Sequence, residues 1–139
     1  MNRTPERQAF LTDVLTNYVE GHPYSWFDVR DYEWFQPGLS GGTAKPAIID
    51  GKPAPNVTGT IRVSDPEKDE GHFMPWRKLT PALAERGFAR LAEGPIEGLS
   101  EECRARLLGA SAIHDSGLLD VNDDDIVLQV AMLGSVVYA

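Results

Sequence analysis

Residues 120–139 read DVNDDDIVLQVAMLGSVVYA, an acidic cluster that runs directly into the most continuous apolar segment of the chain. Aspartates in a first turn suit the positive end of a helix dipole, and Asn122, three residues before Asp125, resembles a capping box. These features predict a buried helix over about 123–133, followed by a short extended tail. A buried strand is the alternative, because hydrophobic periodicity alone does not distinguish a short buried strand from a short buried helix.

Length and charge restrict the class of protein. A chain of 139 residues, 42% of them hydrophobic, is expected to fold as one domain spanning residues 1–139. The formal net charge of −8 argues against a general phosphate-backbone binder, because such proteins rely on lysine and arginine. We therefore expect no direct nucleic-acid binding.

Cysteine use and hydropathy indicate the compartment. The single cysteine, Cys103, excludes an internal disulfide and suits a reducing environment. The N-terminus shows no signal-peptide-like run, and the final apolar segment of about 14 residues is shorter than the ~18–20 that a membrane span needs. The expectation is a cytoplasmic protein without membrane contact.

Three further helices are predicted from their boundary signals. Threonine–proline pairs open two helices, one over about 5–20 with Gly21 as its stop, and one from Pro81 to Gly94. Ser100 caps the third, with glutamates in the first turn. The core candidates of this third helix are Cys103, Leu107, Leu108, Ala110, Ser111 and Ile113.

Aromatic and β-branched residues predict the strands. One strand is expected over about 27–35, bent or bulged near Asp31, and another over 58–64. A third, over about 72–76, would be short or at an edge because Pro75 cannot donate a ladder hydrogen bond. Together they predict a small antiparallel sheet.

The segment at about 36–57 is rich in proline and glycine. Asp50-Gly51 is typical of a hairpin tip, but we expect disorder or an insertion rather than a functional loop here. The predicted fold class is α+β: an N-terminal helix, a small antiparallel sheet of two or three strands, then three C-terminal helices packed on it.

Metal and cofactor signals are weak. Asp120, Asn122 and Asp124 resemble the opening of a calcium loop, but Asp125 stands in place of the glycine and Ala131 in place of the bidentate glutamate. A helix start that suits the dipole is the favoured interpretation. No cofactor is predicted.

The catalytic candidates are equally weak. His72, His114 and Asp115 could take acid–base roles, and His114-Asp115 could form an oriented imidazole at a helix end. A solvated helix terminus is the commoner arrangement. Cys103 falls on the core face of its helix, which favours a buried, inert thiol.

Aromatic residues are the most suggestive feature for binding. Residues of this kind on both faces of a small sheet can fill a core on one side and leave a recognition surface on the other. Their sequence neighbours are acidic, which disfavours base stacking. The binding candidates are Tyr24, Trp26, Tyr32, Trp34 and Trp76.

Two segments carry a resemblance. Residues 7–15, RQAFLTDVL, and residues 123–139, DDDIVLQVAMLGSVVYA, are similar to a group of small uncharacterised proteins carried by actinobacterial phages, plasmids and chromosomes. The resemblance implies an intracellular, mobile-element setting. It implies no activity, cofactor or site residue.

Two functional hypotheses follow. The favoured one is a small acidic accessory protein, a regulatory or anti-host factor of a phage or plasmid, that binds a protein partner through an aromatic surface and could self-associate. The alternative is a small enzyme or ligand-binding domain with a His/Asp pocket between sheet and helices.

Overall fold

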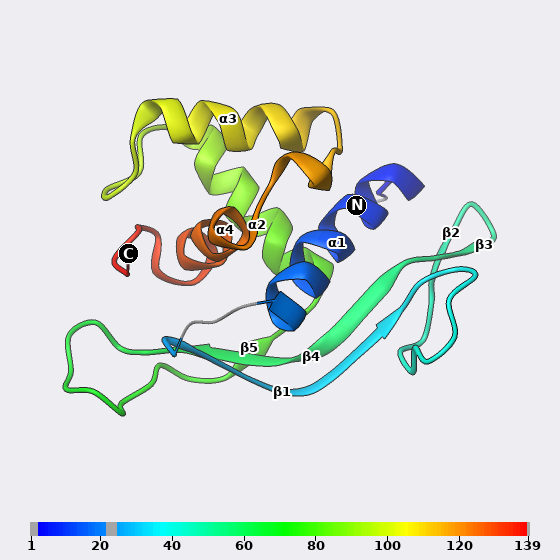
Figure 1. Ribbon diagram of the computed structural model, residues 1–139, viewed down its shortest axis with the longest axis horizontal. Coiled ribbons are helices and arrows are strands. Elements are labelled where there is room, and N and C mark those ends of the chain that lie inside the picture. The colour runs from blue at the N-terminus through cyan, green and yellow to red at the C-terminus, as the bar shows by residue number, and fades with distance from the viewer. Residues whose placement is uncertain (1–2, 22–24, 139) are drawn as a thin grey trace.

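The helices and the main sheet form two layers. The computed structural model describes residues 3–21 and 25–138, in which the helices lie on one side of a three-stranded antiparallel sheet (Figure 1). The predicted α+β class, with an N-terminal helix, a small antiparallel sheet and three C-terminal α-helices, is confirmed.

The four predicted helices are present. The helical elements are α1 (Pro5–Gly21), α2 (Pro81–Glu93), α3 (Glu101–Ala112), the 3-10 helix η1 (Ser116–Leu118) and α4 (Val121–Leu133). Ser100 caps α3 as predicted, since its Oγ accepts a hydrogen bond from the Cys103 N–H at 3.1 Å. Across the described stretches, no helix combines the length and apolar character needed to cross a membrane.

The start of α4 differs from the prediction. Asp120, and not Asn122, is the N-cap: its carboxylate accepts from the Asp123 N–H at 2.9 Å, and the Asp123 carboxylate accepts from the Asp120 N–H at 3.0 Å. This reciprocal pair satisfies two backbone donors at once, so the helix begins two residues earlier than expected.

The main sheet has the order β1-β4-β5, with β1 at Phe27–Phe35, β4 at Asn56–Val63 and β5 at Arg77–Lys78. The predicted irregularity in β1 is confirmed, because the register shifts between Arg30 and Glu33 and Asp31 has φ 57°. The third strand was predicted too early. Phe73 makes only an isolated bridge to Ser64, and regular pairing resumes after Pro75, which has no N–H.

The proline-rich segment folds. It contains the hairpin of β2 (Ala47–Ile49) and β3 (Lys52–Ala54), with Asp50-Gly51 at its tip as predicted. The expectation of disorder is wrong, because hydrogen bonds anchor the segment: the Ala44 N–H donates to the Trp34 carbonyl, and the Asn56 side chain donates to the Lys45 carbonyl.

The core lies between the inner face of the sheet and the helices α1, α2 and α4 (Figure 1). α2 and α4 approach each other closely at Gly87, where a Cβ atom would lie 2.5 Å from the Val127 carbonyl oxygen. In α3, Leu107, Ala110 and Ser111 are buried as predicted. Ile113 is 65% exposed, against expectation, because the helix ends at Ala112 and Ile113 lies beyond its last turn.

Two glycine substitutions test the α2–α4 contact. Gly87→Ala is expected to lower the free energy of unfolding by roughly 1–3 kcal/mol, because the added methyl overpacks the interface. Gly109→Ala in α3 has open space around it and should stabilise the fold by up to about 1 kcal/mol through helix propensity. Urea unfolding followed by circular dichroism measures both changes. Equal effects of the two substitutions would contradict the close approach.

Candidate functional site

One face of the main sheet is uncovered. In β4, the buried Val57, Ile61 and Val63 alternate with the outward-pointing Thr58, Thr60 and Arg62. Paired residues of neighbouring strands share a face, so those opposite Thr60 and Arg62 in β1 and β5 also point outward. All described helices lie on the other side, which leaves this face open (Figure 1).

Arginines and aromatic rings stack on the open face. The Arg30 guanidinium lies 4.0 Å from the ring centroid of Trp76, and the Arg62 guanidinium lies 4.5 Å from Trp76 and 4.2 Å from Phe73. Guanidinium groups at these distances are attracted to the faces of the rings. We call the four residues Arg30, Arg62, Phe73 and Trp76 the arginine–aromatic layer.

The layer is electrostatically mixed. Arg62 forms an ion pair with Asp28 at 3.0 Å, and Arg30 donates to the Thr60 hydroxyl at 3.2 Å. Glu33 lies opposite Thr58 on the same face, and Lys78 lies opposite Thr60. Positive and negative groups therefore alternate across this surface in a protein whose net charge is −8.

A groove adjoins the open face at Phe73. It encloses about 490 Å³ between the loop that follows β4 and the C-terminal tail. Trp26 and Tyr138 line it, and their rings stack with centroids 5.5 Å apart and planes 8° apart; we call this pair its back wall. Exposed Val137 adds apolar surface. The charged residues that line the groove, which we call its rim, are Asp65, Lys68, Asp69 and Glu70. We call this site the aromatic–acidic groove.

Two buried residues of α4 hold the back wall. One Asp125 carboxylate oxygen accepts from the Trp26 indole N–H at 2.8 Å, and the other accepts from the Gln129 amide at 2.8 Å. The Gln129 side-chain amide oxygen, Oε1, accepts from the backbone N–H groups of Val137 and Tyr138, each at 2.9 Å. The groove is therefore supported by α4, the buried helix predicted from the sequence.

The start of α4 contains two further buried carboxyl groups, those of Asp123 and Asp124, whose pKa values are shifted in opposite directions. Burial alone would raise the pKa of Asp123, but hydrogen bonds from Arg106 at 2.7 and 2.8 Å and from the Asp120 N–H outweigh it, so the pKa is lowered. Asp124 is 1% exposed, and its two carboxyl oxygens find no hydrogen-bond partner in the described part of the chain. Burial, followed by the charges of Asp123 and Asp120, raises its pKa to about 8.

The weak metal candidates do not converge. Asp120 caps α4, Asn122 is exposed, and Asp124 is buried in the core. Within residues 3–21 and 25–138, no group of three or more histidine, cysteine, aspartate or glutamate side chains is arranged to hold a metal ion.

The catalytic candidates lie in separate places. His72 is exposed in the loop after β4, with its Nδ1 3.1 Å from the Asp69 carbonyl oxygen. His114 is exposed just beyond α3, where its ring meets the edge of Phe10. Asp115 caps η1 by accepting from the Gly117 N–H at 3.0 Å. Cys103, expected to be buried, is half-exposed, and the Arg106 guanidinium lies 3.6 Å from its Sγ.

The predicted aromatic binding set is divided among three places. Trp26 belongs to the groove and Trp76 to the open face. Tyr32 donates to the Glu20 carboxylate of α1 at 2.7 Å, and Trp34 also lies on the α1 side of the sheet. Tyr24 lies outside the described residues. Phe73, Arg30, Arg62 and Tyr138, which complete the two sites, were not predicted as site residues.

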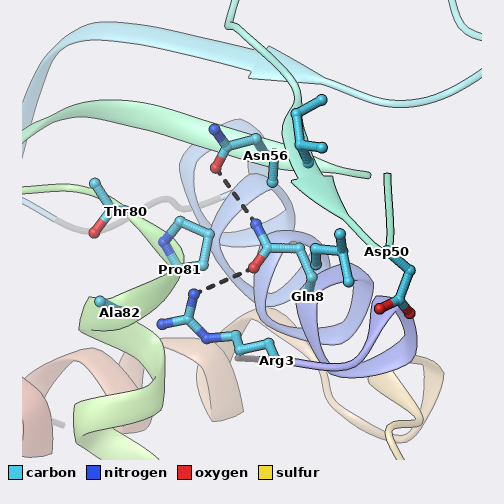
Figure 2. Close-up of a pocket in the computed structure, with 10 residues that line it drawn as sticks. Arg3, Gln8, Asp50, Asn56, Thr80, Pro81 and Ala82 are labelled. Carbon is cyan, nitrogen blue, oxygen red and sulfur yellow. Dashed lines mark hydrogen bonds between the residues drawn. The ribbon is translucent and has the colours of Figure 1, made fainter. Parts of the chain in front are cut away.

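A further cavity of about 480 Å³ lies between the start of α1, the β2–β3 hairpin and the start of α2 (Figure 2). Arg3 donates to the Gln8 side-chain oxygen, Oε1, at 3.2 Å, and the Gln8 side-chain nitrogen, Nε2, donates to the backbone carbonyl of Pro55 at 2.8 Å. Figure 2 shows this row extending to Asn56. Because these polar groups satisfy one another, we assign the row a structural role in joining α1 to the strands.

Comparisons with protein-family models, with curated proteins and with solved structures found no match to this chain. The resemblance of residues 7–15 and 123–139 to mobile-element proteins therefore stays a prediction.

Asp124→Asn is expected to stabilise the protein at alkaline pH. The folded carboxyl has a pKa of about 8, against about 3.9 in an unfolded chain, so the folded state holds a proton that the unfolded chain releases. The free energy of unfolding is therefore not reduced by Asp124 below about pH 4, and it falls by at most about 1.4 kcal/mol per pH unit from there until about pH 8. Asparagine does not titrate, so the variant does not lose this stability as the pH rises.

Urea unfolding at about pH 5 and about pH 8 measures the effect. Asp69→Asn, which changes an exposed carboxylate, is the matched control and should leave the pH dependence as in the wild type. An unchanged pH dependence in Asp124→Asn would show that Asp124 is ionised in the folded protein.

Proposed function

We propose that this chain is a small acidic binding protein that recognises another protein through the open face of its sheet. The observation that carries the proposal is the arginine–aromatic layer, which lies on a sheet face that no described helix covers. Tryptophan and arginine are the residue types most enriched among interface residues that dominate binding energy.

The geometry of the layer suits a protein partner. Arg30 and Arg62 hold the Trp76 ring by stacking, so a partner would order little that is not already ordered. The outward threonines, Thr58 and Thr60, add hydroxyl groups to the same face. A face of this composition offers apolar contact with polar groups around it, which is the usual anatomy of an interface.

The charge pattern favours protein over nucleic acid. Asp28 already neutralises Arg62, and Glu33 on the same face opposes the remaining cations, Arg30 and Lys78. A nucleic-acid site gains affinity from uncompensated cations that displace phosphate counterions. Because the cations of this face are already opposed by carboxylates, they would add little affinity for a nucleic acid.

The proposal includes a setting. The single cysteine suits a reducing compartment, and the resemblance of the chain termini suits an accessory or regulatory factor of a mobile element. We place the protein in the cytoplasm on these grounds. Self-association is one way in which the same face could be used.

Trp76→Ala and Arg30→Ala test the face. A partner is captured from cells of the natural host on the immobilised chain, identified and purified, and its Kd is then measured against each variant. We expect Trp76→Ala to weaken binding by about 2 kcal/mol, roughly thirtyfold in Kd, because a central ring of an interface is lost.

The matched controls are Ile48→Ala and Arg86→Ala, exposed residues of the hairpin and of α2 that lie away from the face. They should bind as the wild type does. The proposal is wrong if the purified partner binds both face variants with wild-type affinity. It is equally wrong if the Trp76 indole resonance responds to a single-stranded oligonucleotide and to no captured protein.

A further inference from the structure

We infer that the aromatic–acidic groove is a second binding site, and that its occupant is a lysine or arginine side chain of a partner protein. The site adjoins the open sheet face at Phe73, but its test does not depend on that face. Three observations carry the inference: the shape of the groove, the sign of its rim and the rigidity of its back wall.

The shape suits a long side chain with an apolar stem. The cavity of about 490 Å³ is walled by the stacked rings of Trp26 and Tyr138 and by exposed Val137. Lysine and arginine carry three or four methylene groups that pack on such surfaces while the charged head stays at a polar rim. The stack leaves one face of each ring uncovered, and an uncovered ring face attracts a cation directly.

The rim supplies the complementary charge. Asp65, Asp69 and Glu70 line the groove together with one cation, Lys68. Asp65 and Tyr138 both line the groove, and the pKa of Tyr138 is raised by burial and then by the charge of Asp65. A basic side chain that lies on the ring would therefore meet carboxylates at its end.

The back wall is preorganised. Trp26 is held by Asp125, and the backbone at Tyr138 is held by Gln129, while the Tyr138 hydroxyl donates to the Ser64 carbonyl at 3.0 Å. Asp125 is 4% exposed and Gln129 is fully buried. Because the wall is fixed before binding, a ligand does not have to order it, and this preserves affinity.

Other occupants fit less well. An acidic peptide or a nucleic acid would be repelled by the three carboxylates, and a purely apolar segment would desolvate them without compensation. In the described residues these carboxylates are not arranged as a metal-binding group. A cation on an apolar stem satisfies both the rings and the rim.

The three tryptophans give a site-resolved test. In a ¹⁵N-labelled protein, the indole N–H resonances of Trp26, Trp34 and Trp76 report on the groove, the α1 side of the sheet and the open face respectively. The probe is a short synthetic peptide of alternating arginine and leucine, and its counterpart has glutamate in place of arginine. We expect the arginine peptide to shift the Trp26 resonance and the glutamate peptide to leave it unchanged.

Variants that neutralise the rim carboxylates test whether the arginine of the peptide lies beside them. Asp69→Asn combined with Glu70→Gln is expected to weaken binding of the arginine peptide roughly fivefold, since exposed ion pairs contribute about 0.2–1 kcal/mol each. Glu6→Gln combined with Glu102→Gln is the control, because it removes the same charge from exposed helix positions elsewhere. The control should bind like the wild type.

A second variant tests the wall. Tyr138→Leu keeps apolar bulk but removes the ring that stacks on Trp26, so it should also weaken binding of the arginine peptide. Its thermal unfolding is recorded to confirm that it folds. If Tyr138→Leu does not fold, the inference is tested by the Asp69→Asn, Glu70→Gln variant alone.

Several results would overturn the inference. The first is a Trp26 resonance that does not shift with the arginine peptide, and the second is one that shifts equally with the glutamate peptide. The third is an affinity for the arginine peptide that the Asp69→Asn and Glu70→Gln changes do not lower. A Trp26 resonance that moves with protein concentration alone would assign the groove to a second copy of the chain instead. A response confined to Trp76 would assign the peptide to the open face.

Discussion

The structure depends on the hydrogen-bonded side chains of Asp125 and Gln129, which lie one turn apart inside α4. Through Asp125 they fix Trp26 at the start of the sheet, and through Gln129 they fix the C-terminal tail. Buried polar groups of this kind are costly unless each is satisfied. The bond between Asp125 and Gln129 lies within α4, and their other bonds attach Trp26 and the C-terminal tail to that helix, so packing and site geometry have a common origin.

Much of this architecture could be predicted from local signals. Caps, proline positions and periodicity located the helices, and the change of apolar parity near Asp31 located the bulge in β1. The errors arose where a residue's hydrogen-bond partner is distant in sequence, or where two residues compete for the same capping role. Asp120 is the cap because it and Asp123 satisfy each other reciprocally. The Asp125 carboxylate, which an Asn122 cap would need, accepts hydrogen bonds from Trp26 and Gln129 instead.

The sites were harder to predict. Trp26 and Trp76 were recognised as binding candidates, but nothing in the sequence shows that Arg30 and Arg62 would stack on Trp76, since that depends on strand register. Net charge was also a poor guide to local charge. The open face alternates cations and anions, while the groove beside it is acidic. One available signal was Gln129, the only amide within an otherwise apolar run.

The bulge in β1 has a consequence for how the chain meets other molecules. β1 is a nine-residue strand at the edge of its sheet, and a long regular edge offers a template on which another chain could add a strand. The left-handed Asp31 interrupts the ladder after Arg30, and the acidic side chains along β1 repel the same strand in a second copy. The protein can thus expose one whole face of a sheet while its margin remains protected from indiscriminate aggregation.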